Sequence, residues 1–312
     1  MLASQDGEKL PLPPVPAPAR AGGSEAALVA SDGQPVAPGR IPEGTAPEAR
    51  ALWERIVAAA RAGPARNPVR SFDLRFDVVV RGESSRNDLG RVRYAFRSDQ
   101  GWLRSVWEKS GRVELRGERG DWLIDADLVT PLVGRENAES RRELDEWVAI
   151  ARNFLALSDP RSIAIVSLAR ADVPEVPMPT EELAKLAEGL AWLSVESPDF
   201  RVVTGSVATT PVYRAGLGVD VATGEVRLAL LQDAASRFAL APSTLLVHVA
   251  TWIELDGHRV PRDLAVHQVE ATEPGAPARR FEERPVAELW LLTRDSRLDP
   301  ALPKEMFLPP EH

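Results

Sequence analysis

The side chains best suited to chemistry in this sequence are two imidazoles and one carboxylate, at His248, His267 and Asp263. If the segments around them pair as a hairpin, His248 lies opposite Ala265, with Asp263 and His267 as its diagonal neighbours. Diagonal neighbours on a sheet are about 7–8 Å apart, which is close enough to share an ion. Two imidazoles and a carboxylate could then hold a metal with open coordination positions. An exposed polar face explains the same residues more simply, so we predict no metal.

The three residues lie in Ser243–Ala271, the stretch around which the rest of the chain is organised. Its residues alternate in polarity at the period of a strand with one buried face. Asp256-Gly257 supplies a two-residue turn, because both central positions of such a turn tolerate positive φ. A hairpin of this length is typical of a large, curved antiparallel sheet. The pairs expected on its apolar side are Leu255 with His258, Ile253 with Val260, Val249 with Leu264, and Val247 with Val266.

No enzyme signature accompanies these residues. The sequence contains no Gly-x-Ser-x-Gly elbow, no His-Glu-x-x-His, no P-loop and no dinucleotide-binding fingerprint after a strand. Gly216 and Gly218 fall inside a predicted strand, where a bulge is the simpler explanation. Cysteine is absent, which removes disulfides, thiolate metal sites and cysteine nucleophiles. We therefore predict a protein without enzymatic activity and without a cofactor.

The composition indicates a globular protein without a nucleic-acid partner. The chain has 312 residues, 44% of them hydrophobic, and a formal net charge of −8, with no basic stripe between aromatics. No apolar run is long enough to cross a bilayer, so we expect a soluble chain. Met1–Ser4 leads straight into polar residues, so no signal peptide is expected. The mature form of an exported protein would look the same.

The chain divides into a tether and one domain. Residues 1–44 are rich in proline, glycine and alanine, a composition that favours extended, solvated chain. Residues 45–312 follow the pattern of one helix, about five strands, a helical insertion and about six strands, the first of these near Phe200–Val207. This order predicts a mainly β (α+β) fold. We expect a single curled antiparallel sheet of about eleven strands, an unclosed barrel with helices plugging its concave side.

The helices are predicted from capping residues and apolar stripes. The first begins near Thr45, and the long middle helix covers Glu136–Leu157. Asp159-Pro160 is a further start signal, so Ile163–Leu168 is predicted as helix, although its β-branched residues would also suit a strand. A last helix opens at Thr180. Their apolar stripes must be buried, and the concave side of the sheet is the natural place.

Over about residues 45–310 the layout resembles the outer-membrane lipoprotein carrier and receptor superfamily, the LolA/LolB-like half-barrel. The first helix runs into VRSFDLRFDVVVRG, and the strands GRVRYAFRSDQGWLRSVW and VELRGERGDWLID precede the long helix. WIELDGHRVPRDLAV and the closing LDPALPKEMFLPP complete the match. The resemblance implies an unclosed antiparallel barrel, with helices over its mouth, around an apolar cavity for acyl chains. Family carriers hold this helical lid through an Arg on an early strand, and Arg97 is nearest in position, followed here by Ser98.

The resemblance implies binding or transport of acyl chains in the periplasm or cell envelope, as in lipoprotein sorting. An acyl chain of roughly sixteen carbons resists entering water by about 13 kcal/mol, so a carrier must offer comparable apolar surface. The same residues could instead be an ordinary core that leaves no cavity. The expected lining, taken from inward strand positions and helical stripes, is Leu52, Ile56, Phe72, Phe76, Tyr94, Phe96, Trp107, Trp147, Phe154, Val249 and Ile253.

An acylated lipid or lipoprotein is therefore the expected partner. We expect a monomer, which an N-terminal anchor absent from this sequence could hold at a membrane. The alternative is an envelope protein-interaction or stress-sensor module on the same fold. Such a module would present an exposed apolar patch outside the barrel rather than inside it.

Overall fold

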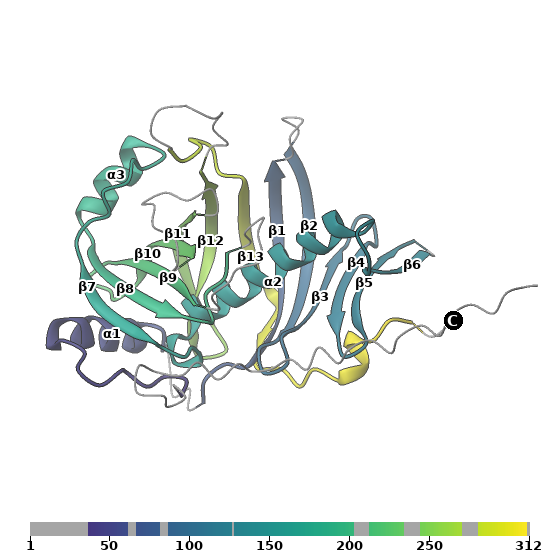
Figure 1. The fold of residues 1–312 in the computed structure, drawn as a ribbon, viewed down its shortest axis with the longest axis horizontal. Helices are drawn as coiled ribbons and strands as arrows, with labels where there is room; N and C mark the ends of the chain where they lie inside the picture. Colours follow the sequence, from purple (N-terminus) through teal and green to yellow (C-terminus); the bar gives the residue numbers. More distant parts are fainter. Residues whose placement is uncertain are drawn as a thin grey trace, which may run out of the picture.

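The computed structural model describes residues 37–61, 67–81, 87–126, 128–202, 212–233, 244–269 and 280–310. Within these ranges, thirteen strands form one antiparallel sheet (Figure 1). The first six are β1 (Ser71–Arg81), β2 (Asn87–Arg97), β3 (Trp102–Trp107), β4 (Val113–Gly117), β5 (Gly120–Asp125) and β6 (Leu128–Pro131). The others are β7 (Ser167–Ala171), β8 (Ala191–Ser197), β9 (Tyr213–Val219), β10 (Val226–Asp233), β11 (Leu245–Leu255), β12 (His258–Gln268) and β13 (Ala287–Leu298). The helices are α1 (Pro47–Ala59), α2 (Ala138–Ser158), α3 (Glu181–Glu188) and the 3₁₀ turns η1 (Pro160–Ser162) and η2 (Lys304–Phe307).

Two meanders make up the sheet. The strand order is β6-β5-β4-β3-β2-β1-β13-β12-β11-β10-β9-β8-β7, so consecutive strands are neighbours in each half and β1 joins β13. The outer edges β6 and β7 are linked in sequence by α2, whose 21 residues span about 31 Å. The link therefore crosses the concave side, and the sheet curls around it (Figure 1). The predicted class, mainly β with one unclosed antiparallel sheet, is confirmed.

The central hairpin forms in the predicted register. Asp256 and Gly257 have φ angles of 48° and 78°, as a two-residue type I′ turn requires. Leu255 pairs with His258, and the expected pairs follow through to Val247 with Val266. The register shifts around Thr251, so β11 carries an irregularity of the bulge type at its middle.

The main core lies between the inner face of the sheet and the helices α1 and α2. The apolar residues of α1 in this core include Leu52, Trp53 and Ile56, and those of α2 include Trp147 and Phe154. Both helices show the apolar stripe that the sequence indicates. No helix in the described part of the chain is both long and apolar enough to span a membrane.

Helix α3 departs from the expected position, because it packs on the outer face of the sheet. Leu228 and Leu230 of β10 belong to a second cluster with α3, whereas Ala229 and Leu231 belong to the main core. Successive side chains of a strand point to opposite faces, so these two clusters lie on opposite sides of β10. The hydroxyl of Thr180 accepts a hydrogen bond from the Leu183 N–H (3.3 Å), which caps α3 at its predicted start.

Three strands, β6, β7 and β8, are not predicted by the sequence pattern. Trp192 of β8 lies in the outer cluster, while Leu193 lies in the main core, so burial on both faces removes the alternation of polarity. The helix predicted at Ile163–Leu168 is wrong, because this segment runs extended into β7. Of the strand expected near Phe200–Val207, residues 200–202 are not in a strand and residues 203–207 lie outside the described residues.

The start of the domain also differs in detail. The N-cap position of α1 is Ala46, without a side-chain cap, and the Thr45 hydroxyl instead donates to the Pro42 carbonyl (2.7 Å). Residues 1–36 of the predicted tether lie outside the described residues. Its last residues contact the domain, since the Gly39 N–H donates to the Ile163 carbonyl (2.8 Å) and Ile41 packs against the main core.

Candidate ligand-binding site beneath helix α2

The eleven residues expected to line an acyl cavity gather in one apolar cluster. Nine are buried members of the main core, and Trp107 and Ile253 pack against it while partly buried. They come from α1, α2, β1, β2, β3 and β11. The sequence pattern therefore identifies one face of the sheet and the helices that cover it.

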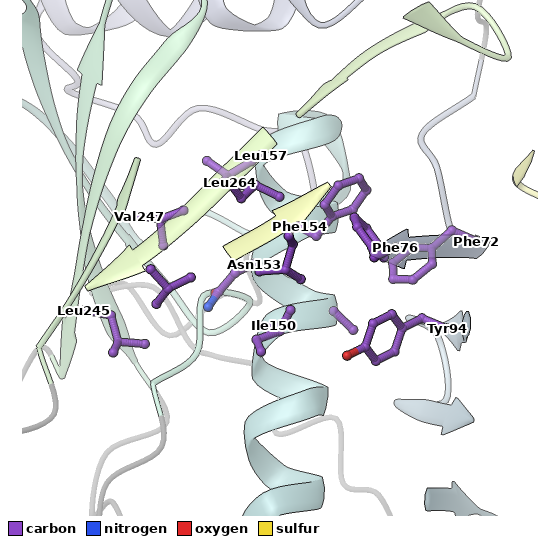
Figure 2. A pocket seen from close by; sticks show the side chains of 13 residues that line it. Phe72, Phe76, Tyr94, Ile150, Asn153, Phe154, Leu157, Leu245, Val247 and Leu264 are labelled. Carbon is purple, nitrogen blue, oxygen red and sulfur yellow. The ribbon is translucent and has the colours of Figure 1, made fainter. Parts of the chain in front are cut away.

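A cavity of about 50 Å³ lies at the centre of this cluster, beneath α2 (Figure 2). Phe72, Phe76, Tyr94 and Phe154 line it, whereas the other seven predicted residues pack elsewhere in the cluster. Among the described residues that line it, Asn153 and Tyr94 are the polar ones. The amide of Asn153 is occupied, donating to the Arg201 carbonyl (2.8 Å) and accepting from the Arg201 N–H (2.9 Å). The remaining lining residues are Ile150, Ala151, Leu157, Leu245, Val247, Leu264, Val266 and Leu289.

Aromatic contacts hold α2 against the sheet on both sides of the cavity. The ring of Phe154 lies 5.7 Å from Phe72 and 5.6 Å from Phe76, centroid to centroid. About two turns earlier, the ring of Trp147 lies 5.5 Å from Tyr94 and 5.7 Å from Trp107. Such tilted and edge-on pairs stabilise beyond simple area burial. We call the inner face of the sheet beneath α2 the trough. The C-terminal half of α2 thus covers the apolar part of the trough, around Phe72 and Phe76.

The N-terminal half of α2 covers a polar row instead. Tyr94, Ser105 and Glu114 are cross-strand neighbours on β2, β3 and β4. The Ser105 hydroxyl donates to Glu114 (2.7 Å), and Arg112 lies 2.9 Å from the other carboxylate oxygen. The Glu114 side chain is only 1% exposed. Burial raises the pKa of Glu114 to about 7, and the nearby charge of Glu143 adds to this rise, against the Ser105 hydrogen bond.

Two arginines connect this row to α2. Arg112 pairs with Glu143 (2.6 Å) and Arg116 pairs with Asp145 (2.7 Å), so the helix contributes a carboxylate to each guanidinium. Arg116 also pairs with Asp121 of β5 (2.8 Å). Although burial opposes its charged form, the hydrogen bonds that Arg116 donates to Asp121 and Asp145 raise its pKa. These contacts make β4 the electrostatic attachment of α2.

Four buried polar atoms at this attachment have no hydrogen-bond partner among the described residues: Tyr94 Oη, Trp147 Nε1, Arg112 Nε and Glu114 Oε1. The hydroxyl of Tyr94 points toward α2 (Figure 2). Burial, with the charges of Glu114 and Glu143, raises the pKa of Tyr94 well above its usual value, so the phenol keeps its proton. Buried polar atoms are normally paired, so these four mark an incompletely satisfied site.

Arg97, the lid residue that the resemblance suggests, contacts its own hairpin. Its guanidinium pairs with Asp99 (2.9 Å) and lies 5.3 Å from the centroid of the Trp102 ring. Among the described residues, the sheet arginines paired with carboxylates of α2 are Arg112 and Arg116. A role of Arg97 in holding a lid remains a prediction.

The histidine–aspartate group of the central hairpin is not gathered around a common point. The Asp263 carboxylate accepts a hydrogen bond from the Thr251 hydroxyl, and Nδ1 of His267 lies 3.1 Å from the Glu282 carbonyl. Burial lowers the pKa of His248, and the charge of Arg227 adds to this effect. Within the described ranges, no three His, Asp or Glu side chains are grouped so as to hold a metal ion.

Sequence reasoning missed the polar half of the site. Glu114 and Arg116 alternate along β4 and Arg112 immediately precedes it, and alternating charges along a strand predict a solvated face. The available signal is the pairing register, because Ser105 opposite both Tyr94 and Glu114 puts these residues on one inner row. Their partners on α2 lie about thirty residues further along the chain.

The chain was also compared with known proteins. No family model and no curated protein matches it. A DUF1329 family protein from Desulfovibrio piger is similar in structure, with a TM-score of 0.42 and 14% identity over 83% of this chain and 97% of that one. A LolA superfamily protein from Nitrosomonas europaea has a TM-score of 0.42 and 12% identity over 84% and 97%. An outer membrane lipoprotein-sorting protein domain from Vibrio parahaemolyticus has a TM-score of 0.37 and 9% identity over 83% and 97%.

Proposed function

We propose that this chain is a non-enzymatic, envelope-associated protein that binds the acyl chain of a lipid or lipoprotein beneath α2. The observation that supports this is the apolar trough itself, a continuous inner face of an unclosed sheet whose cavity lies beneath α2. The cavity lies directly beneath α2, so displacing this helix would give an incoming apolar chain access to it.

The closed form leaves too little room for such a ligand. An apolar cavity of about 150 Å³ holds a molecule the size of benzene. The cavity beneath α2 has about 50 Å³. An acyl chain can therefore enter only if α2 moves out of the trough.

Burial of the apolar side chains of α2 and burial of an acyl chain contribute comparable free energies. Burying one large apolar side chain contributes about 1.5–3 kcal/mol, so five of them contribute about 8–15 kcal/mol. A chain of roughly sixteen carbons contributes about 13 kcal/mol. Exchange of α2 for an acyl chain is then close to balanced, as a carrier that must also release its ligand requires. The α2 side chains counted here are Leu144, Trp147, Phe154, Leu155 and Leu157.

The test is saturable binding of hexadecanoic acid, measured by calorimetry and by native mass spectrometry. Phe154→Ala weakens the packing of α2 against the trough. It should therefore strengthen binding of hexadecanoic acid about tenfold, while lowering the free energy of unfolding by about 3–5 kcal/mol. Phe281→Ala is the matched control, because Phe281 is equally buried but lies in the outer cluster under α3. It should lose similar stability and leave binding unchanged.

Two results would contradict the proposal. One is a well-folded protein that binds no acyl ligand in any variant, and the other is an equal gain in binding for both variants. The first result would favour the protein-interaction alternative. Among the described residues, the exposed large apolar side chains that such a module could use are Leu128, Val133, Val173 and Val221.

A further inference from the structure

The side chains with which α2 contacts the trough indicate the chemistry of a ligand that could take its place. Helix α2 presents two kinds of chemistry to the sheet, apolar rings at Phe154 and Trp147 and carboxylates at Glu143 and Asp145. The rings lie over the aromatic residues of β1, β2 and β3, and the carboxylates lie over the arginines at β4. The trough is therefore complementary to an apolar segment that ends in negative charge.

Removing α2 takes one carboxylate acceptor from each of the two arginines at β4. Arg112 and Arg116 are 31% and 25% exposed, and each would lose the carboxylate that the helix supplies. Glu114 would remain beside Arg112, and Asp121 would remain beside Arg116. Each guanidinium would keep one carboxylate, but the N–H group that now faces α2 would lose an acceptor, which is unfavourable for a partly buried donor. A neutral acyl ligand would replace the rings of α2 but not its carboxylates.

The polar row also contains an unsatisfied hydrogen-bond donor, the hydroxyl of Tyr94. The hydroxyl of Tyr94 is buried and has no hydrogen-bond partner in the described structure, and its ring lines the cavity. Tyr94 thus sits at the boundary between the apolar part of the trough and the arginines. A ligand whose chain lies against Phe72 and Phe76 would bring its head group to this hydroxyl.

We propose that the trough selects an acyl chain that carries an anionic head group, with Arg112, Arg116 and Tyr94 as the head-group site. The inference rests on the proposed acyl-binding function and names the class of ligand. A carboxylate and a phosphate share this chemistry, since guanidinium groups hydrogen-bond well to both. The head group takes the place of Glu143 and Asp145 as the chain takes the place of the α2 rings.

The test compares ligands of equal chain length by calorimetry at neutral pH. Hexadecanoic acid and palmitoyl lysophosphatidic acid are the anionic probes, monopalmitoylglycerol is the neutral probe, and inorganic phosphate tests the head group alone. We expect both anionic probes to bind about tenfold or more tightly than the neutral probe. Phosphate alone should not bind measurably. The tighter of the two anionic probes identifies whether the site suits a carboxylate or a phosphate.

Two variants break the same ion pair from opposite sides. Glu143→Gln loosens α2 but keeps Arg112, so it should strengthen binding of the anionic probes and preserve their preference. Arg112→Gln also loosens α2 but removes the guanidinium. It should therefore strengthen binding of the neutral probe and bring the ratio of anionic to neutral affinity close to one. Arg91→Gln is the control, because Arg91 pairs with Asp77 outside the trough (2.7 Å) and should change neither.

Equal binding of neutral and anionic probes to the wild-type protein would overturn the head-group inference and leave acyl binding intact. Failure of every probe to bind would overturn the proposed function itself. If Arg112→Gln does not fold, salt supplies the second measurement. The preference for anionic probes should fall several-fold between 50 mM and 500 mM salt, because partly exposed charges are screened. A preference independent of salt and of Arg112 would also overturn the inference.

Discussion

Glu114 is the buried acid on which the polar row depends. It touches Ser105 and Arg112, lies near the charge of Glu143, and has a pKa of about 7 because burial disfavours its ionised form. A glutamate in an unfolded chain titrates near pH 4.3. Between these values the folded protein holds a proton that the unfolded chain has released. The stability from protonated Glu114 is thus fully present below about pH 4 and lost as pH rises through about 7.

Replacing Glu114 with Gln should remove this dependence on pH. We expect the free energy of unfolding of the wild-type protein to fall between pH 5 and pH 8 relative to Glu114→Gln, by a difference on the order of 2 kcal/mol. Urea denaturation at several pH values measures it. Ser105→Ala removes the hydrogen bond that favours the ionised form, so it should move the loss of stability to higher pH. Parallel stability profiles for wild type and Glu114→Gln would refute the assignment.

At the scale of single residues, sequence reasoning succeeds for apolar positions and fails for charged ones. Phe76 and Tyr94 alternate with charged neighbours, so their inward direction follows from the period of the strand. Arg112 and Glu114 alternate in the same way, but charge on a strand indicates solvent unless its partner is known. That partner, Glu143, is a tertiary contact that local sequence does not encode.

At the scale of elements, the C-terminal segment depends on a glycine of β4. Phe307 packs with Leu115 on the outer face of the sheet, in a third apolar cluster. A Cβ added at Gly117 would lie 2.0 Å from the Phe307 carbonyl oxygen, so the two backbones can approach only because this side chain is absent.

Gly117→Ala should therefore displace η2 and destabilise the protein by about 1–3 kcal/mol. Gly189→Ala is the matched control, because a Cβ there meets its nearest atom at 3.5 Å and φ is negative. That substitution should be neutral or slightly stabilising. Thermal and urea denaturation give the comparison, with the fluorescence of Trp102, which contacts Phe307, as a local reporter. Equal stability of the two variants would show that the close approach is not required.

Element prediction from sequence succeeded where one face of a strand is solvated or a turn is specific. The central hairpin has both an Asp-Gly turn and a clear apolar side, and its register was predictable to the residue. Strand β8 has neither, because Trp192 and Val195 are buried in different cores. Helix α3 covers a face of the sheet that an ordinary half-barrel pattern leaves to solvent, so its position was not predictable from its own stripe.

At the scale of the whole molecule, the topology places α2 inside the sheet. The sheet has free edges at β6 and β7, and α2 is the covalent link between them. A helix attached at both ends can lift out of the trough without leaving the protein. The order of elements predicted an unclosed barrel with a helical plug, but the pairing of β1 with β13, which makes the two edges, comes only from the structure.

Hydrogen exchange should report this motion directly. We expect saturating hexadecanoic acid to reduce protection of the amides of α2, because the ligand replaces the helix in the trough and leaves it exposed to solvent. The amides of β11 and β12 should keep their protection, since their hairpin pairing does not depend on α2. Glu143→Gln, which weakens the attachment at Arg112, should show part of this loss without ligand. Unchanged protection of α2 at full occupancy would mean that the ligand binds outside the trough, and the exchange of helix for acyl chain would have to be abandoned.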